Sequence, residues 1–367
     1  MFIQSVSLES FRNYTDLSID LDSKINIFYG ANAQGKTNLL EAIYLCATGR
    51  SHRTSYDREM IRWDLDQAHI KLILQKEERQ QKIDMHLRRN SKKGAALNGV
   101  PLQKLGDLLG TLHVVMFSPE DLALIKSGPK ERRRFLDIEL CQLYPVYYYD
   151  LQQYHRLLKQ RNHLLKTLQR KKERKNDLVE TLSIWDEQLI SLGSRIIESR
   201  EEFINQLNEK IRPIHSHITG KKEQLTIRYE QDISIEEYEK KLNKSRQRDI
   251  EQGNTSVGPH RDDLSFWVNG MDIRLYGSQG QQRSVVLSLK LGEIELVKET
   301  IDDVPVLLLD DVLSELDSQR QAYLMDYISD LQTFLTCTGV EDLLLNKFSG
   351  STFYHVKEGK IKKGFEG

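Results

Sequence analysis

The feature that most constrains the fold is the octapeptide Gly30–Thr37, GANAQGKT, which matches the pattern GxxxxGK[ST]. An apolar alternation through Ile25 and Ile27 predicts a strand before it, and Asn38–Ile43 suits a helix after it. In such a strand–loop–helix unit, backbone amides curl around a phosphate and the helix dipole favours its negative charge. The chain is therefore expected to contain an α/β core that binds a nucleotide.

The positions of this loop have separate expected roles. Lys36 would reach the β- and γ-phosphates of ATP, and the Thr37 hydroxyl would hold Mg²⁺. The remaining positions of the loop would bind ATP mainly through their backbone amides. These positions are Gly30, Ala31, Asn32, Ala33, Gln34 and Gly35. The expected cofactors are therefore ATP and Mg²⁺.

An acidic pair ends a second apolar run. Val306–Leu309 predicts a buried strand, and Asp310 and Asp311 follow it directly. A central strand that ends in acids places carboxylates beside the phosphate loop, where Asp310 would orient the Mg²⁺ shell and Asp311 would position a water. We therefore expect Lys36, Asp310 and Asp311 to form the catalytic set.

A third motif stands between these two. Ser278–Arg283, SQGQQR, precedes an apolar helix and resembles the LSGGQ signature of ABC-type ATPases, with Gln279 in place of the first glycine. In that superfamily the signature binds the γ-phosphate of ATP held by another head. The resemblance implies an ATP-dependent homodimer in which four residues act in trans: Ser278, Gln279, Gly280 and Gln281. Leu313–Asp317 fits the D-loop of the same superfamily.

The middle of the chain has helical periodicity. Apolar residues recur alternately every four and three positions from Tyr147 to Leu168 and again from Leu178 to Ile196. The pattern predicts either an antiparallel helical hairpin or two ordinary core helices, the second ending at Pro213. The expected domains are residues 1–130 (head with the phosphate loop), 131–253 (helical arm) and 254–367 (head with signature, acidic pair and D-loop).

The spacing and several short strings indicate a family. The 242 positions from Lys36 to Ser278 exceed the spacing of a transporter subunit and resemble the SMC-like group, where a coiled coil interrupts the head. From about residue 3 to residue 340 the chain resembles the bacterial RecF family. The strings that carry this resemblance are FRNY (11–14), GRSHRT (49–54), FSPEDL (117–122), RRRFLD (132–137), GPHRDD (258–263) and GSQGQQR (277–283).

This resemblance implies a fold and a function. The fold would be an α/β P-loop ABC-type ATPase head, split in sequence, with an inserted, mostly helical second lobe containing a short antiparallel coiled-coil hairpin. The function would be that of a DNA-dependent ATPase in recombinational repair. It would bind gapped duplex and single-stranded DNA and, with RecR and RecO, promote loading of RecA. The family is also linked to replication-fork repair and the SOS response.

Alternatives remain open. Asp311 stands where ABC enzymes usually carry a glutamate, so we expect weak hydrolysis that serves as a switch. A scaffolding clamp or an ABC-type ATP switch with another partner is the competing function. A transport subunit is disfavoured by the long insertion.

Charge limits how DNA could be bound. The formal net charge is −1, so phosphate contacts must come from local patches. The candidate contacts are Arg132, Arg133, Arg134, Arg170, Lys171 and Lys172. The first three face either DNA or nearby carboxylates, and the last three belong to a basic run that is either a solvated helix face or a phosphate contact.

Composition also suggests a compartment. No apolar run approaches the roughly 20 residues of a membrane span, and the N-terminus has no apolar signal segment. Three widely spaced cysteines exclude a disulfide scaffold and a cysteine-rich zinc site. We therefore expect a cytoplasmic protein without a membrane partner.

Overall fold

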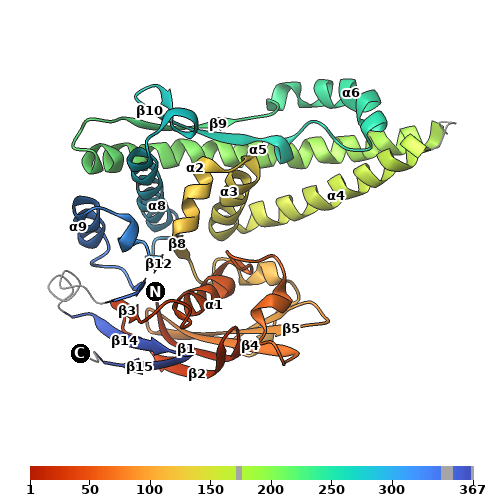
Figure 1. The fold of residues 1–367 in the computed structure, drawn as a ribbon. Coiled ribbons are helices and arrows are strands. Elements are labelled where there is room, and N and C mark those ends of the chain that lie inside the picture. Colours follow the sequence, from red (N-terminus) through yellow and green to blue (C-terminus); the bar gives the residue numbers. More distant parts are fainter. Residues whose placement is uncertain (171–175, 340–349, 365–367) are drawn as a thin grey trace. The chain divides into compact units, whose positions relative to one another are not determined.

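The computed structural model describes residues 1–170, 176–339 and 350–364 (Figure 1). The chain divides into two compact units. We call Met1–Leu122, His217–Gly220 and Val286–Gly367 the head unit, and Ala123–Ser216 and Lys221–Val285 the arm unit. The head is thus split in the sequence, and the predicted fold class is confirmed.

The border of the arm unit differs from the expected one. Its second end lies at Val285, inside helix α8 (Gln279–Ile301), whereas the sequence suggested residue 253. The reason is strand pairing, because β10 (Asp263–Val268) pairs in antiparallel register with β9 (Leu225–Glu230). This pairing keeps the following residues, including the signature motif, in the arm unit.

The head unit contains a largely parallel sheet of order β15-β14-β3-β13-β12-β8. Only β15 runs antiparallel to its neighbour. The three central strands are buried at every position, as expected for strands covered on both faces. The strands are β3 (Ile25–Tyr29), β8 (Val114–Phe117), β12 (Val306–Asp310), β13 (Thr333–Cys337), β14 (Thr352–Lys357) and β15 (Lys360–Lys363).

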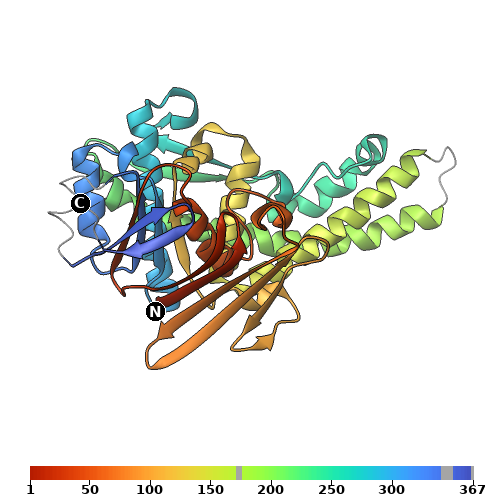
Figure 2. The ribbon, with the colours of Figure 1, turned by 60° about the horizontal axis from the view of Figure 1, so that its bottom comes forward.

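A second, antiparallel sheet of the head unit has the order β2-β1-β4-β5-β6-β7 (Figure 2). Helix α1 (Lys36–Thr48) contacts strands of both sheets. Asn98 and Gly99 form a hairpin turn between the paired residues Leu97 and Val100, with φ of 54° and 81°. The strands are β1 (Phe2–Phe11), β2 (Tyr14–Asp20), β4 (Gln67–Lys76), β5 (Arg79–Arg88), β6 (Gly94–Leu97) and β7 (Val100–Pro101).

Short helices complete the head unit. They are η1 (Asp57–Met60), η2 (Leu105–Leu108), η3 (Pro119–Leu122), η5 (Leu313–Glu315) and α9 (Ser318–Tyr327). No helix among the described residues is both long and apolar enough to cross a membrane.

The arm unit combines helices with the small sheet β11-β10-β9. Its two longest helices are α4 (Pro145–Arg170) and α5 (Asn176–Ile218), which run antiparallel (Figure 1). The other elements are α2 (Ala123–Lys126), α3 (Pro129–Leu143), α6 (Ile235–Gln252), η4 (Pro259–Arg261), β11 (Met271–Asp272), α7 (Ile273–Tyr276) and the start of α8.

The helical hairpin is present, and a third helix covers it. On α4 the buried stripe includes Tyr147, Leu151 and Tyr154 as predicted, but Leu157 rather than Leu158 is buried. Helix α6 packs on α4, and Leu165, Leu168, Leu182 and Ile250 form one apolar cluster. The arm is therefore a three-helix packing rather than an isolated coiled coil.

Pro213 does not end the second helix as predicted. Helix α5 continues to Ile218 and has 43 residues, or about 65 Å at 1.5 Å per residue. A proline removes one backbone hydrogen bond and crowds the preceding turn. Buried Ile211, Ile214 and Ile218 on either side of it hold the last turns in the core.

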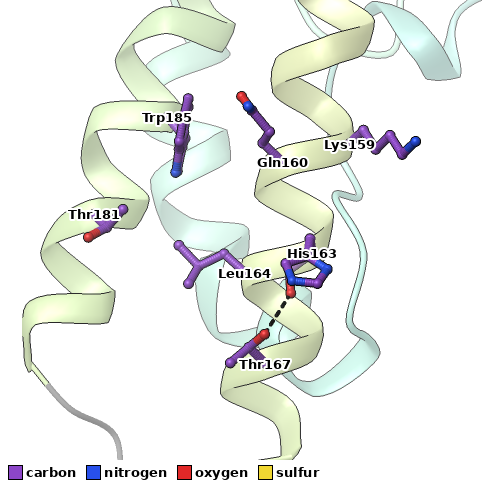
Figure 3. Close-up of a pocket in the computed structure, with 7 residues that line it drawn as sticks. All are labelled: Lys159, Gln160, His163, Leu164, Thr167, Thr181 and Trp185. Carbon is purple, nitrogen blue, oxygen red and sulfur yellow. Dashed lines mark hydrogen bonds between the residues drawn. The ribbon is translucent and has the colours of Figure 1, made fainter.

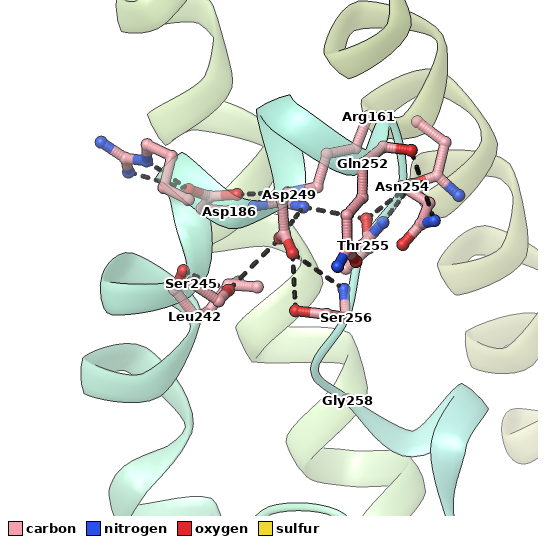
Figure 4. A network of polar contacts seen from close by, with 12 residues as sticks. Arg161, Asp186, Leu242, Ser245, Asp249, Gln252, Asn254, Thr255, Ser256 and Gly258 are labelled. Carbon is pink, nitrogen blue, oxygen red and sulfur yellow. Dashed lines mark hydrogen bonds and ion pairs between the residues drawn. The ribbon is translucent and has the colours of Figure 1, made fainter. Parts of the chain in front are cut away.

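A buried ion-pair network joins the three helices of the arm (Figure 4). The fully buried guanidinium of Arg161 donates to Asp186 Oδ1 on α5 at 2.6 Å and to Asp249 Oδ2 on α6 at 2.8 Å. The same side chain also donates to Thr255 Oγ1 at 2.9 Å. Arg246 of α6 donates to the second oxygen of Asp186 at 2.8 Å, so opposite charges on all three helices pair with one another.

Arg161→Met is expected to lower the free energy of unfolding by about 3–5 kcal/mol, because it leaves the buried Asp249 carboxylate without its cation and Asp186 with Arg246 alone. The measurement is urea denaturation followed by circular dichroism. Arg195→Met is the matched control, since Arg195 pairs with Asp150 in the same arm but is 51% exposed. That change should cost less than about 1 kcal/mol. Equal losses in the two variants would contradict a structural role for the network.

A candidate nucleotide-binding site in the head unit

The predicted phosphate loop connects β3 to α1, as the sequence suggested. The loop amides from residue 31 to residue 35 make no hydrogen bond with another described residue. Helix α1 also starts without a side-chain cap. The first amides of a helix have no partner within it, so the loop and the helix start together present unpaired donors to an anion.

Two glycines of the loop have no room for a side chain. Gly30 has a φ of 146°, and a Cβ there would lie 2.3 Å from the Val356 carbonyl oxygen. Gly35 has a φ of 120°, and its Cβ would lie 2.8 Å from Asn13 Nδ2. Both the backbone conformation and the close packing therefore require glycine.

The loop is held from outside by residues of other segments. Asn13 Nδ2 donates to the Gln34 carbonyl at 2.8 Å, and the Tyr14 hydroxyl donates to the Gly35 carbonyl at 2.9 Å. The amide of Gly359 donates to the same Gln34 carbonyl at 3.1 Å. These bonds occupy the Gln34 and Gly35 carbonyls with partners from other segments, which fixes this end of the loop before any ligand binds.

Lys36 folds back over the loop. Its Nζ donates to the carbonyls of Gly30 at 2.6 Å and Ala31 at 2.8 Å, and the residue is only 7% exposed. Burial lowers the pKa of Lys36, while Asp311 and Asp310 act in the opposite direction. The ammonium therefore lies at the centre of the loop, among groups that a phosphate could replace as partners.

Asp310 is brought to the loop by the order of the strands. Thr37 Oγ1 donates to Asp310 Oδ1 at 2.9 Å, and Thr336 Oγ1 donates to the same oxygen at 2.7 Å. Strand β13, which carries Thr336, lies between β3 and β12. The other carboxylate oxygen of Asp310 accepts no hydrogen bond from a described residue.

Asp311 is fixed through its backbone. Its φ is 53°, its amide donates to Thr336 Oγ1 at 2.9 Å, and its carbonyl accepts from Ser314 Oγ at 2.7 Å. Burial and the adjacent Asp310 raise the pKa of Asp311. Its carboxylate acts on Lys36 electrostatically, so the three predicted catalytic residues lie together in the head unit.

The donor set fits Mg²⁺ and a nucleoside triphosphate. The Thr37 hydroxyl and the Asp310 carboxylate are hard oxygen ligands within hydrogen-bond distance of each other. No cluster of three or more His, Cys, Asp or Glu side chains suited to a metal occurs among the described residues. Few protein ligands are typical of Mg²⁺, which takes much of its shell from water and phosphate oxygens.

Sequence reasoning missed Thr336 and Glu41. Thr336 shows no signal in the sequence beyond its place near the end of the apolar strand β13. Glu41, buried on α1, accepts hydrogen bonds from Arg12 Nε at 2.8 Å, Arg12 Nη2 at 2.6 Å and Ser51 Oγ at 2.5 Å. Burial alone would raise the pKa of Glu41, but these hydrogen bonds, with the charges of Arg12 and Arg53, lower it. The ion pair between Arg12 and Glu41 connects α1 to the end of β1.

The signature residues lie in the arm unit, at the start of α8. Ser278 Oγ accepts from the Gln281 amide at 3.2 Å, and Gln281 Oε1 accepts from the Ser278 amide at 3.1 Å. This is a reciprocal capping box. Ser278, Gln279 and Gly280 are exposed. The motif is therefore a surface helix start in this chain.

The predicted DNA contacts differ in their burial and in their hydrogen-bond and ion-pair partners. Arg132 is 4% exposed and donates to both oxygens of Asp263, so its predicted role as a DNA contact is wrong and the carboxylate alternative holds. Arg133 donates to the Asp262 carbonyl at 2.7 Å, and Arg134 lies 3.9 Å from Glu131. Arg170 is exposed at the end of α4, whereas Lys171 and Lys172 lie outside the described residues.

The GPHRDD string forms internal contacts in the arm unit. Asp262 Oδ2 lies 2.9 Å from the buried Arg200, and burial raises the pKa of Asp262. His260 Nδ1 lies 2.7 Å from the Tyr154 hydroxyl and its Nε2 lies 3.1 Å from the Thr255 carbonyl. Burial lowers the pKa of His260 to about 4, so this imidazole is neutral near pH 7. The string is structural within the arm unit.

Comparison with known proteins identifies the family. The model described as RecF/RecN/SMC N terminal domain matches residues 2–360. A protein named DNA replication and repair protein RecF, from Agathobacter rectalis, is 52% identical over 362 residues that cover 99% of each chain. The chain belongs to the RecF family. A RecF of the same description from Lachnoclostridium phytofermentans is 50% identical, covering 99% of this chain and 100% of its own.

Solved structures agree with this assignment. A structure titled as the recombination mediator protein RecF-ATP in the RecFOR pathway matches with a TM-score of 0.92 and 34% identity, covering 99% of this chain and 98% of that one. An Smc head bound to the C-winged helix domain of ScpA has a TM-score of 0.56 at 14% identity, covering 99% of this chain and 97% of that chain. The second likeness concerns the fold alone. The resemblance to RecF read from the sequence is confirmed.

Thr336→Val is expected to lower ATP turnover by about 10–100-fold, the usual cost of losing a group that orients a metal-site ligand. The change removes the hydroxyl that positions both Asp310 and the Asp311 amide. The measurement is steady-state phosphate release. Thr333→Val is the control, because its buried hydroxyl lies on the same strand and bonds only the Leu331 carbonyl. Equal turnover in the two variants would remove Thr336 from the site.

Proposed function

We propose that the chain is an ATP-driven switch of recombinational DNA repair, in which ATP joins two copies into a homodimer. The observation that carries the proposal is the pre-formed phosphate loop with Lys36, Thr37 and Asp310 in hydrogen-bonded order, in a chain that matches RecF over its full length. The solved RecF structure with ATP supports the same nucleotide.

Different residues of the head unit have different roles in ATP hydrolysis in this proposal. Unpaired loop amides and Lys36 bind the phosphates, and Thr37 and Asp310 would hold Mg²⁺, which neutralises developing phosphate charge when bound. Asp311 positions the attacking water, and its backbone amide and carbonyl are both held by hydrogen bonds. The aspartate stem is one carbon shorter than that of the usual glutamate, so slow turnover is expected.

The signature of the second copy completes each site in this proposal. Ser278 and Gly280 lie exposed at the start of a 23-residue helix, whose first amides suit a γ-phosphate. ATP would then contribute to the interface, and its hydrolysis would release the dimer. The signature acts in trans, as in other ABC-type enzymes.

Mixing two inactive variants tests this arrangement. Lys36→Ala and Ser278→Arg should each be inactive alone, and activity should return on mixing, because one of the two composite sites in a mixed dimer is intact. Mixing Lys36→Ala with Asp311→Asn is the control. Lys36 and Asp311 both belong to the head-unit half of a composite site. In the mixed dimer each composite site therefore keeps one defective half, and no activity should return. Equal results from the two mixtures would argue against an in-trans signature.

The DNA-directed part of the proposal rests on the family and on local charge. The protein would bind gapped duplex and single-stranded DNA and, with RecR and RecO, promote RecA loading, with links to replication-fork repair and the SOS response. The solved RecF structure is titled within the RecFOR pathway, and this supports the partners. Exposed Arg170 is the strongest described candidate for a phosphate contact, ahead of Arg133 and Arg134. The expected compartment is the cytoplasm.

Gapped duplex DNA is expected to stimulate ATP hydrolysis, and the stimulation should fall as salt rises because phosphate contacts release counterions. The measurement is steady-state turnover against DNA concentration at two salt concentrations. Arg170→Glu should weaken the stimulation, whereas Lys240→Glu, an exposed cation on α6, is the matched control.

Turnover that is indifferent to DNA would contradict the DNA-dependent activity and leave the nucleotide site intact. It would favour the alternative, an ABC-type switch or scaffolding clamp that responds to another partner.

A further inference from the structure

A groove lies between the two long helices of the arm (Figure 3). Its volume is about 440 Å³, within the range that holds a small ligand or a few side chains. Helix α4 contributes one wall and α5 the other. The lining residues are Lys159, Gln160, His163, Leu164, Thr167, Thr181 and Trp185.

The groove has an apolar interior. Leu164 and the indole of Trp185 lie between the two helices, and the lining surface is mainly carbon (Figure 3). Exposed apolar surface inside a concave site is typical of a contact for another molecule.

One edge of the groove is basic. Lys159 lines the groove, and Arg156 and Arg170 extend the row of lining positions 159, 163 and 167 along α4, each by a further three residues. These three exposed side chains make no ion pair with a described residue. The α5 wall contributes Thr181 and Trp185, and neither of them is charged. The electrostatic attraction is therefore directed to one side, so that an acidic occupant would lie along α4 with its apolar groups toward α5.

The groove is built on a fixed scaffold. Arg161 and Asp186, each next to a lining residue in the chain, form the buried ion pair that joins α4 to α5. Leu164 packs against the apolar cluster of Leu165, Leu168 and Leu182. The walls are thus held in register without an occupant, which reduces the entropy cost of binding.

We propose that this groove is a docking site for an acidic segment of a partner protein, anchored by one or two large apolar side chains. A mainly carbon-lined interior gives apolar side chains a favourable environment, whereas a phosphodiester backbone would gain little from it. The cations of α4 would pair with the acidic flanks of the segment, and this selects an acidic partner over a neutral one. The inference does not depend on nucleotide binding by the head unit.

The test is a selection of random twelve-residue peptides displayed on phage against the full chain. Selected peptides should combine Asp or Glu with Trp, Phe, Leu or Ile. Their synthetic, fluorescein-labelled forms are then titrated by fluorescence anisotropy against the wild type and three variants.

Lys159→Glu should weaken binding at least tenfold by reversing the charge at the groove edge. Gln160→Trp, which fills the groove without removing a core side chain, should do the same. Lys240→Glu on α6 is the control and should bind as the wild type does. Circular dichroism verifies that each variant is folded.

Three results would overturn the proposal. Selected peptides could lack acidic residues, or could bind Gln160→Trp and Lys159→Glu as tightly as the wild type. In the third result, a dT20 oligonucleotide displaces the peptides from the wild type, and it also binds the Gln160→Trp variant more weakly than the Lys240→Glu variant. This last result would assign the groove to single-stranded nucleic acid instead.

Discussion

The structure of the candidate site depends on one carboxylate oxygen, Asp310 Oδ1. It accepts hydrogen bonds from Thr37 at the start of α1 and from Thr336 at the end of β13, while Asp310 itself ends β12. Three segments that are far apart in the sequence therefore meet at one atom. Thr336 extends the arrangement by accepting a hydrogen bond from the Asp311 amide, so the position of Asp311 depends on the same point. Since hydrogen bonds to a charged group are the stronger kind, this contact holds the edge of the sheet in place before a ligand arrives.

Much of this site could be predicted from the sequence. The phosphate loop has a strict pattern whose physical requirements, positive φ at glycine and a following helix, are local. The acids at Asp310 and Asp311 follow an apolar strand, so their place at the sheet edge follows from general rules of parallel sheets. Thr336 could not be found in this way, because its role depends on which strand lies between β3 and β12. Strand order is a long-range property that neighbouring residues do not encode.

The arm shows the same division between local and long-range information. The helical stripe of α4 predicted nearly every buried position, yet Arg161 within it reads as one more cation in a basic run. Only the packing of three helices shows that it is fully buried between Asp186 and Asp249. Arg132 gives the same lesson, since its partner Asp263 lies 131 residues away. Charge counts along a sequence therefore overstate the number of cations that are available to DNA. In both cases a carboxylate from another segment of the chain decides the role of the arginine.

The central claim is that ATP binds in the head unit and joins two copies of the chain. Mass photometry of Asp311→Asn with Mg²⁺ and either ATP or ADP tests it most directly, because this variant should bind ATP without consuming it. The account predicts a population with twice the monomer mass, 85.6 kDa from two chains of 42.8 kDa, in ATP and its loss in ADP. A protein that remains monomeric at micromolar concentration in ATP would contradict the account.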